Sequence, residues 1–385
     1  MSTDFDQIIN RKGTSCAKWD GQGGDYIPMW VADMDFLTAP PILDALENRL
    51  SHGVFGYGGR WQDAVLSVVN HYKKTYQVEV DPEWVVYIPS VMPGANLACR
   101  TGGGGLIYCT PMYSHIRRLP QEAHTHVTEV PMKEKNLFYE MDFDALENKV
   151  TEDTGVFVLC NPHNPVGRVY TREELEQAAA FAGKHDLLVV CDEIHCELVL
   201  EGKHTPFFSV NEWAQQNSIT LSSAGKIANI PSLPAGFAII PNPEIRKKFK
   251  EQALGLFSTP NVLAVEALDA AYNGSCREWK EELVSYLREN RDYLEKRISR
   301  IDGLAAVHNQ GTYLTWIDCR KTGLKDPFTF FKEKAKVRFN DGKDYGAVGE
   351  GFVRINFGCP RAQLCEALDR VEKALAGKKE KEDFR

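Results

Sequence analysis

The sequence predicts an α/β protein: a large domain with a mostly parallel, mixed sheet between helices, joined to a smaller α+β domain. Three observations support this fold class. Short runs rich in Val and Ile recur up to residue 241 and end in turn residues. Helical patterns lie between several of these runs, as parallel strands require. Beyond about residue 243, long helical stretches lead to a short α+β section.

Six short segments are predicted to be buried strands. Each is apolar, contains β-branched or aromatic residues and is closed by turn-forming or polar residues. Runs of this length without strict alternation are typical of strands that are covered on both faces. The segments are 84–90, 105–111, 155–162, 187–193, 218–223 and 235–241.

The segment 171–186 is predicted to be a helix that connects two of these strands. Thr171 can accept a capping hydrogen bond, and Glu174 follows three residues later, which is the spacing of a capping box. Longer helices are predicted near the C-terminus, over 244–256, 261–273 and 277–300, with a last helix near 361–376.

The change of pattern after the strands suggests two domains. We assign residues 45–280 to the large domain. The smaller domain combines residues 1–44 with residues 281–385, whose strand-like stretches, LAAVHNQGTYLTWIDCR and FVRINFGCP, lie among helices.

Composition and charge exclude several classes of protein. Hydrophobic residues make up 43% and charged residues 25%, and the net charge of −8 argues against a general nucleic-acid or membrane-surface binder. No apolar run approaches the roughly 20 residues of a membrane span, and the polar start MSTDFDQIINRKG lacks the apolar core of a secretory signal. Ten cysteines occur without a C-x-x-C pair, which favours reduced thiols over a metal site. We therefore expect a cytoplasmic protein with no metal, nucleic-acid or membrane partner.

Unusual polar residues stand where four of the predicted strands end. Each alone has an ordinary structural explanation, as an Asn-Pro turn, a helix cap or a core histidine. Together they converge, because ligands of open parallel sheets bind beyond the carboxyl ends of the strands. The four motifs are SVMPGAN (90–96), NPHNPVG (161–167), DEIH (192–195) and SSAGK (222–226).

The residues in these motifs match the needs of pyridoxal phosphate (PLP). Its aldehyde requires a lysine, and its pyridine nitrogen requires a carboxylate in order to stay protonated. Its phenolic oxygen requires a hydrogen-bond donor, and its phosphate a helix N-terminus and hydroxyls. The small residues before Lys226 let the chain pass close to a flat ring.

The chain resembles fold-type I PLP enzymes of the class I/II aminotransferase superfamily, and within it the cystathionine β-lyase (carbon–sulfur lyase) subgroup. The resemblance covers nearly the whole chain. WVADMDF, HGVFGY and the His of DEIH favour the lyase subgroup. The motifs that carry it are FDQIINRKGTSCAKWD, IPMWVADMDFLTAPPILDAL, HGVFGYG, NPHNPVGRVY, CDEIHCELV, SAGKIANIPSL, GTYLTWID and GFVRINFGCPR.

The resemblance implies roles for five residues around the cofactor ring. Lys226 matches the Schiff-base lysine, which also moves the substrate α-proton. Asp192 matches the partner of the pyridine nitrogen, and Asn164 matches the ligand of the phenolic oxygen. His195 occupies the nearby position that is usually a tyrosine, and Tyr113 matches the aromatic residue that stacks on the ring.

The resemblance also implies how the phosphate is held. Val91 and Met92 match residues whose backbone N–H groups bind it, and Ser223 matches a hydroxyl donor. Tyr57 matches a tyrosine that reaches the phosphate of the partner subunit, so a homodimer is expected. Many members also have a phosphate-binding arginine where this chain has Pro234, and the lyase subgroup often lacks it.

The substrate side is implied in the same way. Arg354 matches the arginine that pairs bidentately with the substrate carboxylate. Ala32 and Asp33 are expected to line the substrate pocket. One departure concerns ACRTGGGGLIYCTPMY, which is shorter than the family's usual helix–turn–strand. The helix there is expected to end early, and the run Gly102–Gly105 to make a loose connection.

The implied activity is β-elimination from L-cystathionine or cysteine-type substrates, which gives pyruvate, ammonia and a thiol. A class I/II aminotransferase is the main alternative, because both reactions begin with removal of the same α-proton. A PLP-binding regulatory protein with weak activity is the second alternative. Release of pyruvate without a keto-acid acceptor distinguishes the lyase from both.

Overall fold

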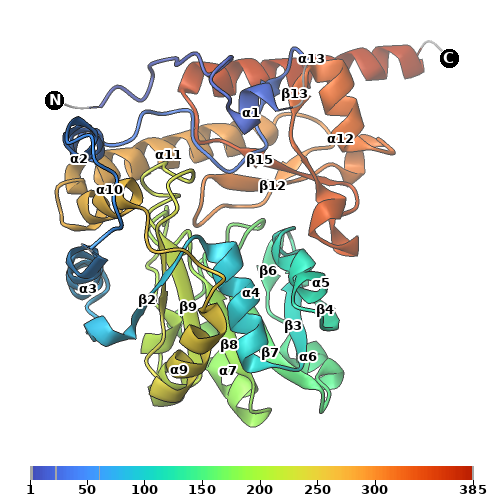
Figure 1. The fold of residues 1–385 in the computed structure, drawn as a ribbon. Coiled ribbons are helices and arrows are strands. Elements are labelled where there is room, and N and C mark those ends of the chain that lie inside the picture. Colours follow the sequence, from blue (N-terminus) through green and yellow to red (C-terminus); the bar gives the residue numbers. More distant parts are fainter. Residues whose placement is uncertain (1–2, 22–23, 60, 384–385) are drawn as a thin grey trace.

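The computed structural model describes residues 3–21, 24–59 and 61–383. At the centre of the fold lies a seven-stranded sheet. The strand order is β2-β10-β9-β8-β7-β3-β4 (Figure 1). Neighbours from β4 to β9 run parallel, whereas β10 is antiparallel to both β9 and β2, so the predicted mixed and mostly parallel sheet is confirmed. The strands are Val85–Ile88 (β2), Gly105–Thr110 (β3), Val127–Pro131 (β4), Thr154–Cys160 (β7), Leu188–Asp192 (β8), Ser218–Ser223 (β9) and Gly236–Ile239 (β10).

All six predicted strands are present, and β4 is an additional one. Strand β4 lies at the edge of the sheet and pairs only with β3. Most of its residues are half-buried, and Glu129 in its middle pairs with Arg117 over 2.7 Å. An edge strand with a charged side chain lacks the apolar run that identifies central strands.

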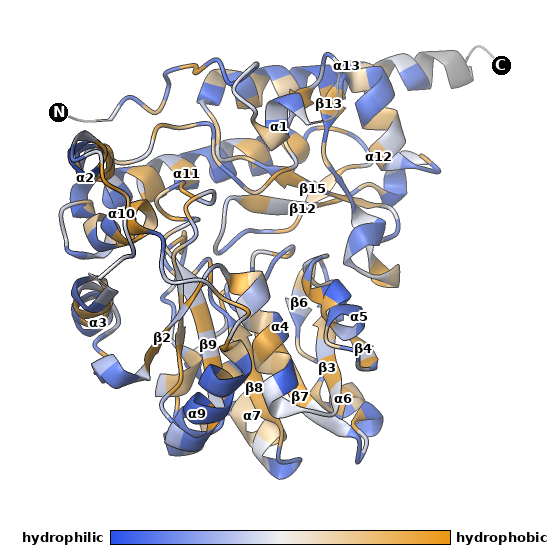
Figure 2. Cartoon of the chain, in the orientation of Figure 1, coloured by the Kyte–Doolittle hydropathy of each residue, from blue (hydrophilic) through white to orange (hydrophobic). Residues whose placement is uncertain are grey.

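Helices cover both faces of the sheet, which explains why its strands are apolar on both sides. In β7, Val156 packs in the cluster that contains residues of helix α4 (Val91–Gly102). Its neighbour Phe157 packs on the opposite face with residues of helix α7 (Arg172–Lys184). Successive side chains of a strand point to opposite faces, so a doubly covered strand buries every residue. Figure 2 shows the resulting apolar colouring along the central strands.

The predicted helices are confirmed, with one difference in length. The capping box of α7 forms as expected: the Thr171 hydroxyl accepts from the Glu174 N–H, and the Glu174 carboxylate accepts from the Thr171 N–H. The last helix is longer than predicted, because the Lys- and Glu-rich tail contains good helix formers. The later helices are Pro243–Ala253 (α9), Val262–Tyr272 (α10), Arg277–Ile298 (α11) and Arg361–Asp383 (α13).

The C-terminal part forms a four-stranded sheet of order β11-β12-β15-β14, which lies above the large sheet in Figure 1. Its strands are Ala305–Ala306 (β11), Leu314–Asp318 (β12), Asn340–Asp341 (β14) and Phe352–Asn356 (β15). Strand β1 (Ile27–Pro28) pairs in parallel with β13 (Val337–Arg338) and so ties the N-terminal segment to this part. The other helices and strands are Ala17–Asp20 (α1), Pro40–Ser51 (α2), Trp61–Tyr76 (α3), Leu119–Glu122 (α5), Lys133–Lys135 (β5), Phe138–Glu140 (β6), Phe143–Lys149 (α6), Glu212–Gln216 (α8) and Pro327–Phe330 (α12).

The predicted domain boundaries, 45–280 against 1–44 with 281–385, remain a prediction. Helix α2 runs across the first boundary and helix α11 across the second. No helix among the described residues is both long and apolar enough to cross a membrane. All ten cysteines are free thiols.

The glycine run after α4 is closely packed, and the expectation of a loose connection was wrong. Gly103 and Gly104 have φ of +73° and +66°, a conformation that favours glycine. A Cβ on Gly105 would overlap the ring of His126, and a Cβ on Gly155 would overlap the Gly103 carbonyl. The glycines therefore let the backbone pack tightly beside β3 and β7.

Candidate active site

Turns at the carboxyl ends of strands in the seven-stranded sheet carry most of the predicted site residues. Strands β2, β7, β8 and β9 point the same way, because β10 reverses direction between β2 and β9. Their carboxyl ends therefore meet at one edge, where ligands of open α/β sheets bind. Two further segments reach this edge from elsewhere in the chain: residues 30–34 and strand β15.

Lys226 lies in the turn between β9 and β10 and reaches the segment 30–34. Its Nζ donates a hydrogen bond to the Ala32 carbonyl oxygen over 2.5 Å, and the Tyr313 hydroxyl donates to the same oxygen over 2.9 Å. Burial, followed by the charge of Arg354, lowers the pKa of Lys226 to about 8, against the opposing effect of two nearby carboxylates. An amine with this pKa is partly neutral near pH 8 and can act as a nucleophile or base.

Asp192 ends strand β8 and is buried. Burial raises the pKa of its carboxyl to about 6, although a hydrogen bond from the Ile194 N–H and the charge of Lys226 oppose this. The Ile194 N–H donates to Oδ1 over 3.1 Å. A buried carboxylate of this kind is stabilised when a cation lies beside it.

Arg354 on strand β15 is buried and held by three oxygens. One terminal nitrogen donates to Asn164 Oδ1 over 3.1 Å, and the other donates to the Trp30 carbonyl over 2.8 Å and to Asn340 Oδ1 over 2.6 Å. Its Nε–H has no hydrogen-bond partner among the described residues. None of these neighbours carries a negative charge, so the guanidinium is available to an anionic ligand.

His195 and Asn164 lie buried beside these charged groups. Burial, then the charges of Lys226 and Arg354, keep the pKa of His195 well below its ordinary value, so its ring is neutral. The Nδ1 atom of His195 is buried and has no hydrogen-bond partner among the described residues. A buried, unpartnered nitrogen facing this edge is an unused hydrogen-bonding group that a ligand can engage.

Tyr113 lies in the loop after β3. Its ring stacks on the ring of His115, with centroids 5.1 Å apart and planes at 20°. The charges of Arg354 and Asp192 both influence the pKa of Tyr113, which burial raises above its ordinary value. Tyr113 is therefore close to two of the predicted site residues.

The start of helix α4 offers free backbone donors. Ser90 at the N-cap makes no capping hydrogen bond with its side chain, and the first backbone bond of the turn runs from the Gly94 N–H to the Ser90 carbonyl. The N–H groups of Val91 and Met92 therefore have no acceptor among the described residues. Such a helix N-terminus attracts a phosphate. At the end of β9, the Ser223 hydroxyl accepts from the Gly225 N–H over 3.1 Å.

One predicted residue, Tyr57, is not placed with the others, and Asp33 lies near Lys226 but is engaged by another partner. Tyr57 is 96% exposed and lies on the surface of this single chain. The Asp33 carboxylate is paired with Arg11 over 2.8 Å, whereas its neighbour Ala32 contacts Lys226 through its carbonyl. The expectation that Ala32 and Asp33 line a substrate pocket stays a prediction.

Sequence reasoning missed several contacts of the site. The carbonyl oxygen of Trp30 and the side chain of Asn340 both bind Arg354, and the hydroxyl of Tyr313 binds the Ala32 carbonyl. Tyr313 stands in the motif GTYLTWID, so the sequence offered a signal for it. Asn340 lies in a segment without such a motif, and a backbone carbonyl leaves no residue-type signal.

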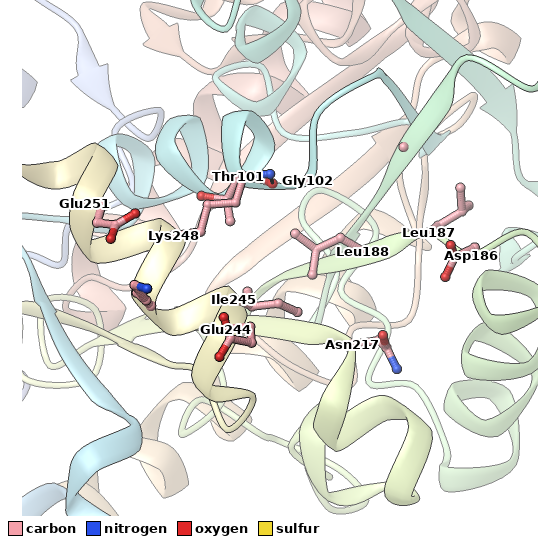
Figure 3. A pocket seen from close by; sticks show the side chains of 12 residues that line it. Thr101, Gly102, Asp186, Leu187, Leu188, Asn217, Glu244, Ile245, Lys248 and Glu251 are labelled. Atoms are coloured by element: carbon pink, nitrogen blue, oxygen red, sulfur yellow. Dashed lines mark hydrogen bonds between the residues drawn. The ribbon is translucent and has the colours of Figure 1, made fainter.

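A surface pocket lies beside the beginning of β8, at the end of that strand opposite to Asp192. Figure 3 shows side chains that line it. Leu187 and Leu188, at the beginning of β8, line it, together with Glu244 and Lys248 of α9. Lys248 already donates a hydrogen bond to the Thr101 carbonyl over 2.6 Å. This pocket contains none of the predicted site residues.

The donors and acceptors at the carboxyl edge fit pyridoxal phosphate. Lys226 offers an amine of lowered pKa, and Asp192 a buried carboxylate for a protonated ring nitrogen. The unpartnered His195 Nδ1 and the free N–H groups at the start of α4 suit its phenolic oxygen and phosphate. The aldehyde, ring nitrogen, phenolic oxygen and phosphate of this cofactor each have a chemically suitable group in the chain.

Comparison with known proteins identifies the class. The chain belongs to the family "Aminotransferase class I and II", whose sequence model matches residues 25–371.

Among individual relatives, the chain is 35% identical to cystathionine β-lyase PatB of Bacillus subtilis (strain 168), over 97% of this chain and all of that protein. Its structure is similar to a PLP-bound putative aminotransferase from Clostridium difficile 630, with a TM-score of 0.94, 32% identity and coverage of 97% and 100%. It is also similar to cystalysin from Treponema denticola, which contains pyridoxal 5′-phosphate, with a TM-score of 0.93, 30% identity and coverage of 98% and 100%.

Proposed function

We propose that this protein is a PLP-dependent carbon–sulfur β-lyase. It acts on L-cystathionine or a similar cysteine derivative and releases pyruvate, ammonia and a thiol. The observation that supports the proposal is that Lys226 and Arg354 bind carbonyls of the same segment, Ala32 and Trp30. The charges of Arg354 and Asp192 both act on Lys226, whose pKa burial lowers to about 8. The preference for elimination rests on the similarity to cystathionine β-lyase PatB along the whole chain.

The proposed chemistry divides among three residues. When bound, pyridoxal phosphate supplies a protonated ring that accepts the electron pair released at the substrate Cα. Arg354 pairs with the substrate carboxylate through its unpartnered Nε–H and a terminal nitrogen. Lys226 removes the α-proton, a step for which general-base catalysis contributes roughly 10²- to 10⁴-fold. Asp192 keeps the ring nitrogen protonated. The sulfur then leaves as a thiolate, and the three-carbon fragment hydrolyses to pyruvate and ammonia.

The other predicted residues hold the cofactor in this proposal. Asn164 and His195 face its phenolic oxygen, and Tyr113 stacks on its ring. Val91 and Met92 donate backbone N–H groups to its phosphate, with the Ser223 hydroxyl beside them. These roles are supported by the position of the residues, which follow the carboxyl ends of strands in the large sheet.

We also propose a homodimer in which Tyr57 reaches the phosphate of the partner subunit. The supporting observation is that large apolar side chains are exposed on the single chain: Phe55 is 54% exposed, Leu254 79% and Leu256 65%. Burying side chains of this size is worth roughly 1.5–3 kcal/mol each when complete. A cytoplasmic location is proposed from the ten free thiols, which persist in reducing compartments.

The test combines purified protein, PLP and L-cystathionine without any keto acid. Pyruvate and free thiol are expected to rise together, and a Lys226→Ala variant is expected to form neither. An aminotransferase would need a keto-acid acceptor and form no free thiol. A regulatory protein would show the visible absorbance of the lysine-bound cofactor with negligible turnover. Either result would overturn the proposed function.

A further inference from the structure

We infer that a buried group of charges near the N-terminus positions the active-site segment 30–34. This N-terminal charge cluster consists of Arg11, Lys18, Asp33 and Asp35. It holds the backbone whose carbonyl oxygens contact the proposed catalytic lysine and the proposed carboxylate-binding arginine. The inference rests on the proposed function, because its effect on turnover requires those two groups to act on an amino acid.

The cluster is a network of short ion pairs. Lys18 Nζ lies 2.7 Å from one Asp35 oxygen and 3.5 Å from an Asp33 oxygen, and it donates to the Asp33 carbonyl over 3.2 Å. Arg11 lies 2.6 Å from the other Asp35 oxygen and 2.8 Å from Asp33, and it donates to the Met34 carbonyl over 3.0 Å. Both cations therefore bind the backbone of the segment as well as its carboxylates.

The centre of the cluster is buried. The side chains of Lys18 and Asp35 are 1% and 3% exposed. Asp35 also accepts hydrogen bonds from Trp19 Nε1 and Gln363 Nε2, each over 2.9 Å. Burial alone would raise the pKa of Asp35, but Lys18, Trp19 and Arg11 hold it below its ordinary value. Removing one partner from such a network leaves a buried charge uncompensated, which is strongly destabilising locally.

The opposite side of the same segment faces the active site. The Trp30 carbonyl accepts from Arg354 over 2.8 Å, and the Ala32 carbonyl accepts from Lys226 over 2.5 Å. The segment thus joins the cluster to the proposed catalytic groups, and the charge of Asp33 also acts on Lys226, whose pKa it raises against the larger effect of burial.

The segment itself has no regular secondary structure to fix its carbonyls. Besides the Asp33 N–H, which donates to the Val31 carbonyl over 2.9 Å, its further supports are side chains. Asn356 Nδ2 donates to the Val31 and Asp33 carbonyls over 2.5 and 2.7 Å, Asn229 binds the N–H and the carbonyl of Met34, and the Tyr313 hydroxyl donates to the Ala32 carbonyl. Irregular backbone depends on such contacts for its orientation, and a shift of 1 Å at a reacting group can lower a rate by about 10²-fold.

The test compares two lysines of the same N-terminal segment. Lys18→Met removes the buried charge, whereas Lys12→Met removes an exposed lysine that lies 3.6 Å from the exposed Asp25. In the Lys18→Met holoenzyme we expect amide hydrogen exchange of a peptide covering residues 29–36 to accelerate by at least about tenfold. Exchange in Lys12→Met is expected to match the wild type.

Kinetics provide the second readout. For Lys18→Met we expect kcat/KM to fall by at least about tenfold, through a raised KM and a lowered kcat, while PLP affinity stays within about threefold. The start of α4 and Asp192, which are proposed to hold the phosphate and the ring nitrogen, have no hydrogen bond or ion pair with the cluster among the described residues, so these two contacts with PLP are expected to be retained. Unchanged exchange and unchanged kcat/KM would overturn the inference, as would loss of PLP affinity in parallel with kcat/KM.

A milder variant covers a failure to fold. Gln363→Leu removes one hydrogen bond from Asp35 and is expected to shift exchange and KM in the same direction by a smaller factor. If Lys18→Met does not fold and Gln363→Leu matches the wild type, the inference is wrong. Wild-type protein that forms no pyruvate would instead reject the proposed function, and the exchange comparison would still decide whether the cluster positions residues 29–36.

Discussion

Replacement of Asp192 by asparagine should stabilise the cofactor-free protein while removing most of its activity. Asp192 is buried at the end of β8 in a site that exposes it to little water. Asparagine has nearly the same shape, and its Oδ1 can keep the hydrogen bond from the Ile194 N–H. The substitution therefore removes a buried charge without leaving a cavity, and the Ile194 N–H keeps its acceptor.

The magnitude follows from the pKa of Asp192. Burial raises this pKa from 3.8 to about 6, which corresponds to a destabilisation of about 3 kcal/mol when the carboxylate is ionised. Above pH 6, Asp192 is ionised in both the folded and the unfolded chain, and the folded state is destabilised by the full amount of about 3 kcal/mol. As the pH falls through 6, the folded chain binds its proton first, so wild-type stability rises until the difference disappears near pH 4. Asp192→Asn should thus gain up to about 3 kcal/mol at pH 7.5 and almost nothing at pH 4.

Urea unfolding of the cofactor-free proteins at these two pH values measures this difference. Asp25→Asn is the control, since Asp25 is exposed and should change stability by less than about 0.5 kcal/mol. A variant no more stable than the wild type at pH 7.5 would refute the reasoning, as would an equal gain at both pH values. With PLP and substrate, the same variant should lose turnover, because a neutral amide cannot hold a proton on the ring nitrogen.

Three further outcomes are expected. Arg354→Lys should lower kcat/KM by about 10²-fold, mainly through KM in steady-state kinetics, because lysine cannot pair bidentately with a carboxylate; an unchanged KM would contradict this. Lys280→Met should destabilise the fold by about 3–5 kcal/mol in urea unfolding near pH 7, because it leaves the buried Glu197, 2.6 Å away, without its main partner. Burial alone would raise the pKa of Glu197, but Lys280 and His71 hold it below its ordinary value. The stability that this pair gives the wild type should therefore decline as the pH falls below about 4.5. Gly155→Ala should lower the unfolding midpoint markedly, because its Cβ would overlap the Gly103 carbonyl. An unchanged midpoint would show that the backbone at Gly103 can shift without loss of stability.

The sheet was largely predictable because its central strands are covered on both faces. Strand β7 buries nearly every residue, so its sequence, TGVFVLC, is a continuous apolar run. Strand β4 escaped prediction because most of its residues are only half-buried and Glu129 interrupts its apolar pattern. The tight packing after α4 was also unpredictable, since nothing in a run of glycines shows whether space is left empty or filled by neighbouring backbone.

The strand-end residues of the site were predictable for a topological reason. Parallel strands bring their carboxyl ends together, so Asp192 and Lys226 had to lie near one another once the sheet was recognised. The contacts of the Trp30 carbonyl were not predictable, because every residue has a carbonyl and only the tertiary fold directs it. The exposure of Tyr57 on a single chain reflects the same limit, since its expected role belongs to a second subunit.

Some contacts of the segment 30–34 can form only late in biosynthesis, because their partners lie near the end of the chain. The Asp33 carbonyl binds Asn356, 323 residues later in the chain. At roughly 5–20 residues per second, a ribosome takes about 16–65 s to produce that partner. Strand β10 completes the large sheet well before then, at Ile239. A nascent chain therefore passes through an interval in which its main sheet can form while Trp30 and its apolar neighbours still lack their final contacts.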